Sequence, residues 1–336
     1  MKKQERKRNK RMLLLLLLLV MTGTMLATST YAWFTSNETV RVDTITVYVE
    51  AQGGIQLSAD GTNWKTVLLT TDLTTVHGTT YTSSVNQLPA ALEPVSTGLN
   101  VTAAGKLEMF YGTVVANNDG DFILTTTPSV ETESNGSTSS GKFVAFDLFF
   151  KSDAATDLYL TGDSDVTTED AQDKGIKNAS RVAFVVLGNT VANDTVANIQ
   201  AIGTTGASSS PVYMWEPNYD VHTAGGVTNA RDTYALTTTQ TGATRITYDG
   251  VINTITSANN VKLGLANATT YNTLFRSVTP TYTTVEGNST STQIFSLQSG
   301  VTKVRVYMWV EGQDVDCENQ ASGGNINYDL VFSINA

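Results

Sequence analysis

The chain has 336 residues, with 31 acidic against 21 basic side chains and a formal net charge of −10 at pH 7. Charged residues make up only 15% of it, against about 25% in average globular proteins. An acidic surface repels nucleic acid and anionic lipid headgroups, so the composition argues against both as partners. A composition rich in Thr, Val, Asn and Gly favours strands and turns over helices.

The first 32 residues have the three parts of a secretory signal peptide. A basic head precedes an apolar run over 12–21, and small and polar residues lead to Ala32. We predict cleavage after Ala32, with Ala27 as the second choice, and export to the cell surface or the extracellular space. The longer apolar stretch over 12–27 falls slightly short of the about 17 residues needed to span a bilayer, and an uncleaved anchor is the alternative. Export machinery and a signal peptidase are the implied partners, and the membrane is contacted only through this leader.

Alternating apolar residues predict the first strand of the exported chain over 39–50. Asp60-Gly61 predicts a tight turn within a hairpin over 55–69, because glycine tolerates a positive φ. A polar stretch over 70–102 predicts a covering loop. Two strands joined by a turn are predicted next, over 106–116 and 121–125.

The segments 143–150 and 181–187 are apolar at nearly every position, apart from Asp147. This predicts strands that are covered on both faces. A threonine cap and an acidic first turn predict one short helix over 168–177. The apolar pattern typical of strands weakens over 188–287 and returns near the end of the chain. Short strands are predicted at 212–215, 245–248 and 261–265, and strong ones at 293–297, 301–310 and 326–334.

Helical periodicity is nearly absent, which predicts an all-β protein: an antiparallel β-sandwich with long polar loops and a large insertion. We divide the chain into the signal or anchor segment 1–32, a sandwich core formed by 33–187 and 288–336, and an insertion or second, looser lobe over 188–287. Because the first and last segments are both strong, we expect both ends of the exported chain to join one sheet system. Cys317 is the single cysteine, so internal disulfides are excluded, and either the core must suffice or bound ions must help.

Two groups of residues near the end of the chain are candidate sites. Asp314, Asp316 and Glu318 alternate after a strong strand and offer oxygen ligands to Ca²⁺, with a solvated turn as the alternative. Tyr307 and Trp309 share one phase of that strand and suggest a platform for stacking sugars, with core packing as the alternative. We predict no cofactor other than this Ca²⁺.

Enzyme motifs are missing from the sequence. The two histidines, His77 and His222, lie far apart in polar stretches, and no His-Glu-x-x-His motif accompanies them. A zinc hydrolase needs a fuller ligand set, and the nucleophile elbow Gly-x-Ser-x-Gly is also missing. We therefore predict that the protein is not an enzyme and that both histidines are exposed to solvent.

Several segments resemble a family of uncharacterised exported proteins of Gram-positive bacteria: TYAWFTSNETVRV, GIQLSADGTNW, FVAFDLFFKS, RVAFVVLGN and VRVYMWVEGQDVDCENQASGGNINYDLVFS. The leader and first strand are also similar in layout to camelysin and the TasA-type fibre proteins of biofilm matrices. That second resemblance implies a jelly-roll fold and polymerisation through an N-terminal strand lent to a neighbour. Camelysin has been classed as a metallopeptidase, but no catalytic residue of it matches a position here.

These observations lead to one main expectation for function and two alternatives. We expect a secreted or cell-surface structural protein that self-assembles into a matrix or surface fibre through the strand over 33–50. The first alternative is an extracellular carbohydrate- or surface-binding module. The second is an exported metallopeptidase.

Overall fold

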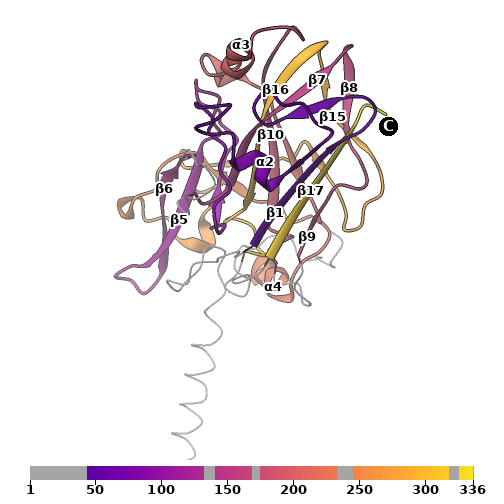
Figure 1. Ribbon diagram of the computed structural model, residues 1–336. Helices are drawn as coiled ribbons and strands as arrows, with labels where there is room; N and C mark the ends of the chain where they lie inside the picture. Colours follow the sequence, from indigo (N-terminus) through magenta and orange to yellow (C-terminus); the bar gives the residue numbers. More distant parts are fainter. Residues whose placement is uncertain (1–43, 132–140, 169–174, 233–244, 318–324, 336) are drawn as a thin grey trace, which may run out of the picture.

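The computed structural model describes residues 44–131, 141–168, 175–232, 245–317 and 325–335. This part of the chain consists mainly of strands in several sheets, with a few short helices (Figure 1), which confirms the all-β class. The leader with Ala32, most of the helix predicted over 168–177, and Glu318 lie outside the described residues.

The first sheet joins the two ends of the described chain. Its order is β15-β8-β17-β1-β3, with β9 beside β17. β1 runs parallel to β17 in an unbroken register from Thr44 opposite Asn325 to Ala51 opposite Phe332 (Figure 1). This confirms that the first and last strands share one sheet, but the sheet is not wholly antiparallel. The strands are β1 (Thr44–Ala51), β3 (Val67–Leu69), β8 (Thr156–Leu160), β9 (Asp165–Thr167), β15 (Thr292–Leu297) and β17 (Asn325–Ser333).

The second sheet has the order β14-β11-β10-β16-β7-β2. Its pairs are antiparallel except for β11 with β14. Every residue of β16 is buried, so this central strand is covered on both faces, and the same holds for nearly all of β7, as predicted. The strands are β2 (Gln56–Ser58), β7 (Val144–Ser152), β10 (Ser180–Thr190), β11 (Val212–Glu216), β14 (Tyr282–Thr283) and β16 (Gly300–Val310).

The two sheets share one hydrophobic core. The ring of Phe332 on β17 meets Phe150 on β7 edge-on at 5.1 Å between centroids, and Phe184 on β10 at 5.8 Å. Because side chains alternate along a strand, Val304 and Val306 of β16 face this core while Arg305 between them faces away. Each fully buried side chain of this size stabilises the fold by about 1.5–3 kcal/mol relative to its exposed state.

The predicted turn at Asp60-Gly61 is present and connects the two sheets. Gly61 has a φ of 71°, which a side chain would strain. The carboxylate of Asp60 accepts the backbone N–H groups of Thr62 and Asn63, each at 2.8 Å. The two arms of the hairpin separate after this turn, since β2 pairs with β7 in the second sheet and β3 pairs with β1 in the first.

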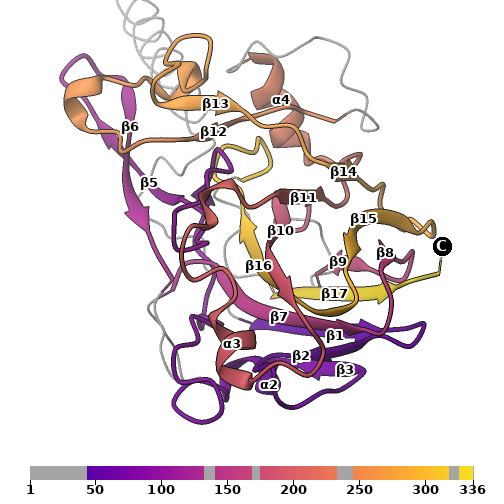
Figure 2. The ribbon, with the colours of Figure 1, turned by 90° about the horizontal axis from the view of Figure 1, so that it is seen from above.

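A smaller lobe lies to one side of the two sheets (Figure 2). It combines the sheet β4-β5-β6 with the pair β12-β13, and Leu124, Val251 and Phe275 pack together between them. The division expected at 188 and 287 is therefore corrected: β11 and β14 belong to the second sheet, whereas β5 and β6 belong to the lobe. These strands are β4 (Val95–Ser96), β5 (Met109–Ala116), β6 (Phe122–Ser129), β12 (Asp249–Val251) and β13 (Phe275–Ser277).

Short helices occupy the connections. Two strand predictions are wrong here: 245–248 is irregular and leads into β12, and 261–265 ends in a 3-10 turn. The apolar residues of the two segments are buried in different places. Val261 and Leu263 pack in the core of the smaller lobe, whereas Ile246 packs with Ala230 and Val315 and Tyr248 packs in the cluster that contains Trp309. The helices are α2 (Thr70–Thr74), α3 (Val196–Ala201), α4 (Ala224–Asp232) and the 3-10 turns η1 (Ala207–Ser209), η2 (Ser257–Asn259) and η3 (Leu263–Leu265).

Candidate functional site

The outer face of the second sheet carries a buried row of polar residues. Alternation along β16 and the residue after it places five side chains on the face opposite the shared core, and all are buried beneath loops and the smaller lobe: Lys303, Arg305, Tyr307 and Trp309 of the strand, and Glu311 directly after it. A charge or polar group removed from water is costly unless it is paired. Each member of the row should therefore have a partner, and those partners define what the row can do.

The first part of the row is an ion cluster around Asp147 of β7. The Nε of Arg305 donates to Asp147 at 2.7 Å, the Tyr81 hydroxyl donates at 2.7 Å, and the Nζ of Lys303 lies at 3.2 Å. Lys303 also donates to the Tyr81 hydroxyl and to the carbonyl of Gln200, both at 2.8 Å. Burial would raise the pKa of Asp147, but Arg305 and Lys303 hold it well below its usual value. The cluster is closed and holds the long loop and α3 onto the sheet.

The predicted aromatic platform does not face solvent. Tyr307 and Trp309 are both fully buried. The Tyr307 hydroxyl donates to Glu131 and accepts the backbone N–H of Leu107 at 2.9 Å, and the Trp309 Nε1 donates to Glu311 at 3.0 Å. The platform prediction is therefore wrong, and the alternative of core packing is correct. Periodicity places both rings on one face but does not show that loops cover that face.

The proposed calcium ligands also point inward. Asp314 is 6% exposed and pairs with Arg181, which binds Glu216 as well at 2.8 Å. Asp316 is fully buried, so the alternative of a solvated turn is wrong for both carboxylates. In the part of the chain that the structure describes, no three His, Cys, Asp or Glu side chains gather closely enough to hold a metal ion. The carboxylates instead balance buried cations and loop N–H groups.

His222 lies against Asp316 and is not exposed as predicted. Its side chain is 6% exposed, and its Nδ1 lies 2.6 Å from the Asp316 Oδ2. The hydroxyl of Thr223 donates to Asp316 at 3.1 Å. Together with the N–H of Thr223, which donates to Asp316 at 2.8 Å, these contacts order the loop before α4.

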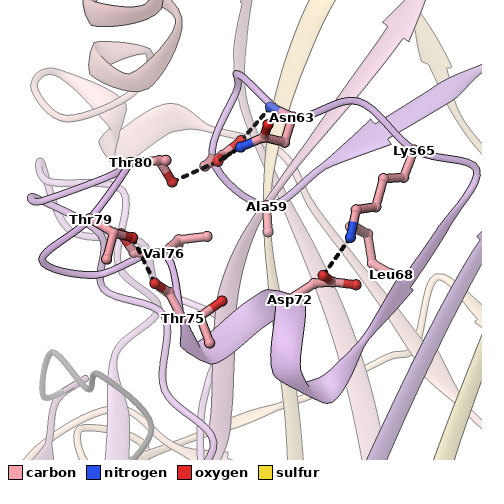
Figure 3. A pocket seen from close by; sticks show the side chains of 10 residues that line it. Ala59, Asn63, Lys65, Leu68, Asp72, Thr75, Val76, Thr79 and Thr80 are labelled. Carbon is pink, nitrogen blue, oxygen red and sulfur yellow. Dashed lines mark hydrogen bonds and ion pairs between the residues drawn. The ribbon is translucent and has the colours of Figure 1, made fainter.

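An open cavity of about 470 Å³ lies between the turn at 59–65 and helix α2 (Figure 3). We call it the α2 cavity. Its floor is apolar and buried, formed by Ala59, Leu68 and Val76. Its rim is polar, and seven residues contribute to it: Asp60, Asn63, Lys65, Asp72, Thr75, Thr79 and Thr80.

Two hydrogen bonds organise this rim. The Nζ of Lys65 donates to Asp72 at 2.6 Å, and the hydroxyl of Thr80 donates to Asp60 at 2.6 Å (Figure 3). Burial would raise the pKa of Asp72, but the N–H of Leu69 and the ammonium of Lys65 lower it below its usual value. Sequence reasoning missed this cavity because it read 70–102 as a loop. The run TTDLTTVHGTT was the available signal, since it places several hydroxyls on one short segment.

No described helix is long and apolar enough to cross a membrane. Comparisons with protein-family models, with curated proteins and with solved structures find no match for this chain.

Proposed function

We propose that this chain is a secreted or cell-surface structural protein, a jelly-roll-like β-sandwich that assembles by exchanging its N-terminal strand over 33–50. One observation carries the proposal. β1 lies between β17 and β3 in the first sheet, and it is the strand nearest the chain's start in the described part. A subunit that lends this strand leaves a slot of matching shape in its own sheet.

The hydrogen bonds of β1 permit exchange because they are the same in its own sheet and in the sheet of a neighbour. β1 pairs with β17 along its whole length and with β3 over Tyr48 to Glu50. The same strand of another copy would meet the same two neighbours in the same register. Val49 and Ala51 are buried in the shared core, so the slot must be filled by one copy or another.

The connection after β1 has the features of a hinge. Gly53 and Gly54 both have positive φ values, 77° and 93°. Four residues separate the end of β1 from the start of β2, which lies in the other sheet. Glycine adopts many backbone conformations at little steric cost, so this connection can extend and direct β1 away from its own sheet. Short connections of this kind favour domain swapping.

Cysteine pairs across the β1–β17 ladder test the proposal. Tyr48 and Asp329 are register partners and are only partly buried. We expect Tyr48→Cys protein mixed with Asp329→Cys protein to form disulfide-linked heterodimers when the two assemble together. Neighbouring strands bring paired Cα atoms within the range that a disulfide requires. Tyr48→Cys mixed with Asp119→Cys, in an exposed turn of the smaller lobe, is the control.

Two results would contradict strand exchange. One is a bond that forms only within a chain carrying both cysteines. The other is a strictly monomeric protein over a wide concentration range, with no filaments in electron micrographs. Export is tested separately: we expect a mature N-terminus at Trp33, following cleavage after Ala32, and a membrane-bound chain that retains Met1 would contradict it.

A further inference from the structure

We propose that the α2 cavity binds a neutral saccharide. This site is distinct from Tyr307 and Trp309, which are buried, and it shares no residue with β1 or with the proposed hinge. Its volume of about 470 Å³ lies within the range of about 300–1,000 Å³ that is typical of small-molecule sites. The chemistry of its rim identifies the class of ligand.

The threonine hydroxyls of the rim are available as acceptors. Thr75 donates its proton to the carbonyl of Thr71 at 2.9 Å, Thr79 to the carbonyl of Thr75 at 2.7 Å, and Thr80 to Asp60 at 2.6 Å. A hydroxyl has one proton and two lone pairs, so each oxygen keeps an accepting position. A ligand that satisfies these oxygens must carry several hydrogen-bond donors.

Lys65 supplies the complementary donors. Its ammonium carries three protons, and one of them goes to Asp72. The side chain is 47% exposed, so its remaining N–H groups can reach a ligand in the cavity mouth. The ligand therefore needs groups that both donate and accept, and the hydroxyls of a sugar do both.

The charges of the rim disfavour ionic ligands. The two carboxylates, Asp60 and Asp72, outnumber the ammonium of Lys65 and repel an anion. Both carboxylates already accept hydrogen bonds from the chain, Asp60 from Thr80 and Asp72 from Lys65, and this disfavours a metal cation or an amine as their partner. The floor formed by Ala59, Leu68 and Val76 offers an apolar surface to the C–H face of a pyranose ring. A neutral ring with hydroxyls around its edge matches both the floor and the rim (Figure 3).

The test uses the mature chain (33–336) and an array of neutral glycans built from glucose, galactose, mannose and N-acetylglucosamine. Calorimetric titration with the captured glycan then gives a dissociation constant. We expect Thr79→Val to weaken binding about three- to tenfold, which corresponds to one lost hydrogen bond. We expect Thr75→Arg to abolish binding, because the exposed Thr75 lies on the rim and a long side chain there fills the cavity.

Thr204→Val is the matched control. Its hydroxyl also donates to a backbone carbonyl at a helix end, that of Ala201 at 2.9 Å, but it lies outside the cavity. It should leave both binding and the melting temperature unchanged. Capture of no neutral glycan, capture unaffected by Thr75→Arg, or a preference for anionic sugars would each overturn the proposal. All three variants should still assemble, so failure here leaves strand exchange standing.

Discussion

The buried ion cluster allows a quantitative prediction for Asp147→Asn. Asp147 is completely buried and balances two cations, Arg305 and Lys303, which are themselves 4% and 0% exposed at their side chains. Asparagine keeps the shape of the side chain but removes its charge, and both cations then remain buried without a counterion. Breaking a buried ion pair in this way costs about 3–5 kcal/mol.

Urea unfolding followed by circular dichroism measures this loss. With a denaturant slope of about 3 kcal/mol per molar urea, the midpoint should fall by about 1–1.7 M. Asp121→Asn is the matched control, because Asp121 forms an ion pair of similar length with Lys262 at 2.6 Å, with side chains 48% and 43% exposed. Exposed pairs contribute about 0–1 kcal/mol, so the control midpoint should hardly move.

The pH dependence has a definite sign. Asp147 has a pKa held below its unfolded value by Arg305 and Lys303, so its contribution is fully present above about pH 4 and is lost as pH falls further. The difference between the wild-type protein and Asp147→Asn should narrow in acid. A loss below about 1 kcal/mol at pH 7, equal to that of Asp121→Asn, would refute the argument that the cluster holds the loop onto the sheet.

Three further predictions follow from other parts of the fold. Burial raises the pKa of Glu311 from 4.5 to about 7. As the pH rises between these two values, ionisation of the buried Glu311 should destabilise the wild-type protein by about 3 kcal/mol relative to Glu311→Gln. Urea unfolding of both proteins at pH 5 and pH 8 measures this difference. Gly61→Ala should cost about 1–3 kcal/mol by thermal unfolding, because its Cβ would also lie 2.7 Å from Ile199; Gly120→Ala, with φ 84° and no atom within 4 Å, should cost less. In single-molecule pulling, load applied to the start of β1 and the end of β17 shears their parallel ladder, so all its hydrogen bonds resist together. Load applied to the starts of both strands unzips the ladder one bond at a time, and separating the strands should then require less force. Equal forces in the two geometries would contradict this.

Local sequence patterns determined much of the secondary structure. Alternating apolar residues located β1, β16 and β17, and continuous apolar runs located β7 and β10, with ends within a few residues of those observed where the structure describes them. Asp60-Gly61 located its turn because a positive φ at glycine is a local property. These features depend only on residues that are close together in the sequence, so the sequence of this one protein is enough to predict them.

Tertiary structure decided which residues are accessible and which strands pair. Periodicity places Tyr307 and Trp309 on one face of β16, but only the packing of loops and the smaller lobe shows that this face is closed. The sequence predicted that the first and last strands share one sheet, but only the fold shows that β1 and β17 run parallel. The hydroxyl-rich run over 70–80 was a local signal, but only the fold shows that it closes a cavity with the turn at 59–65. Alternation tells which side of a strand a residue occupies, whereas burial depends on what distant parts of the chain place over that side.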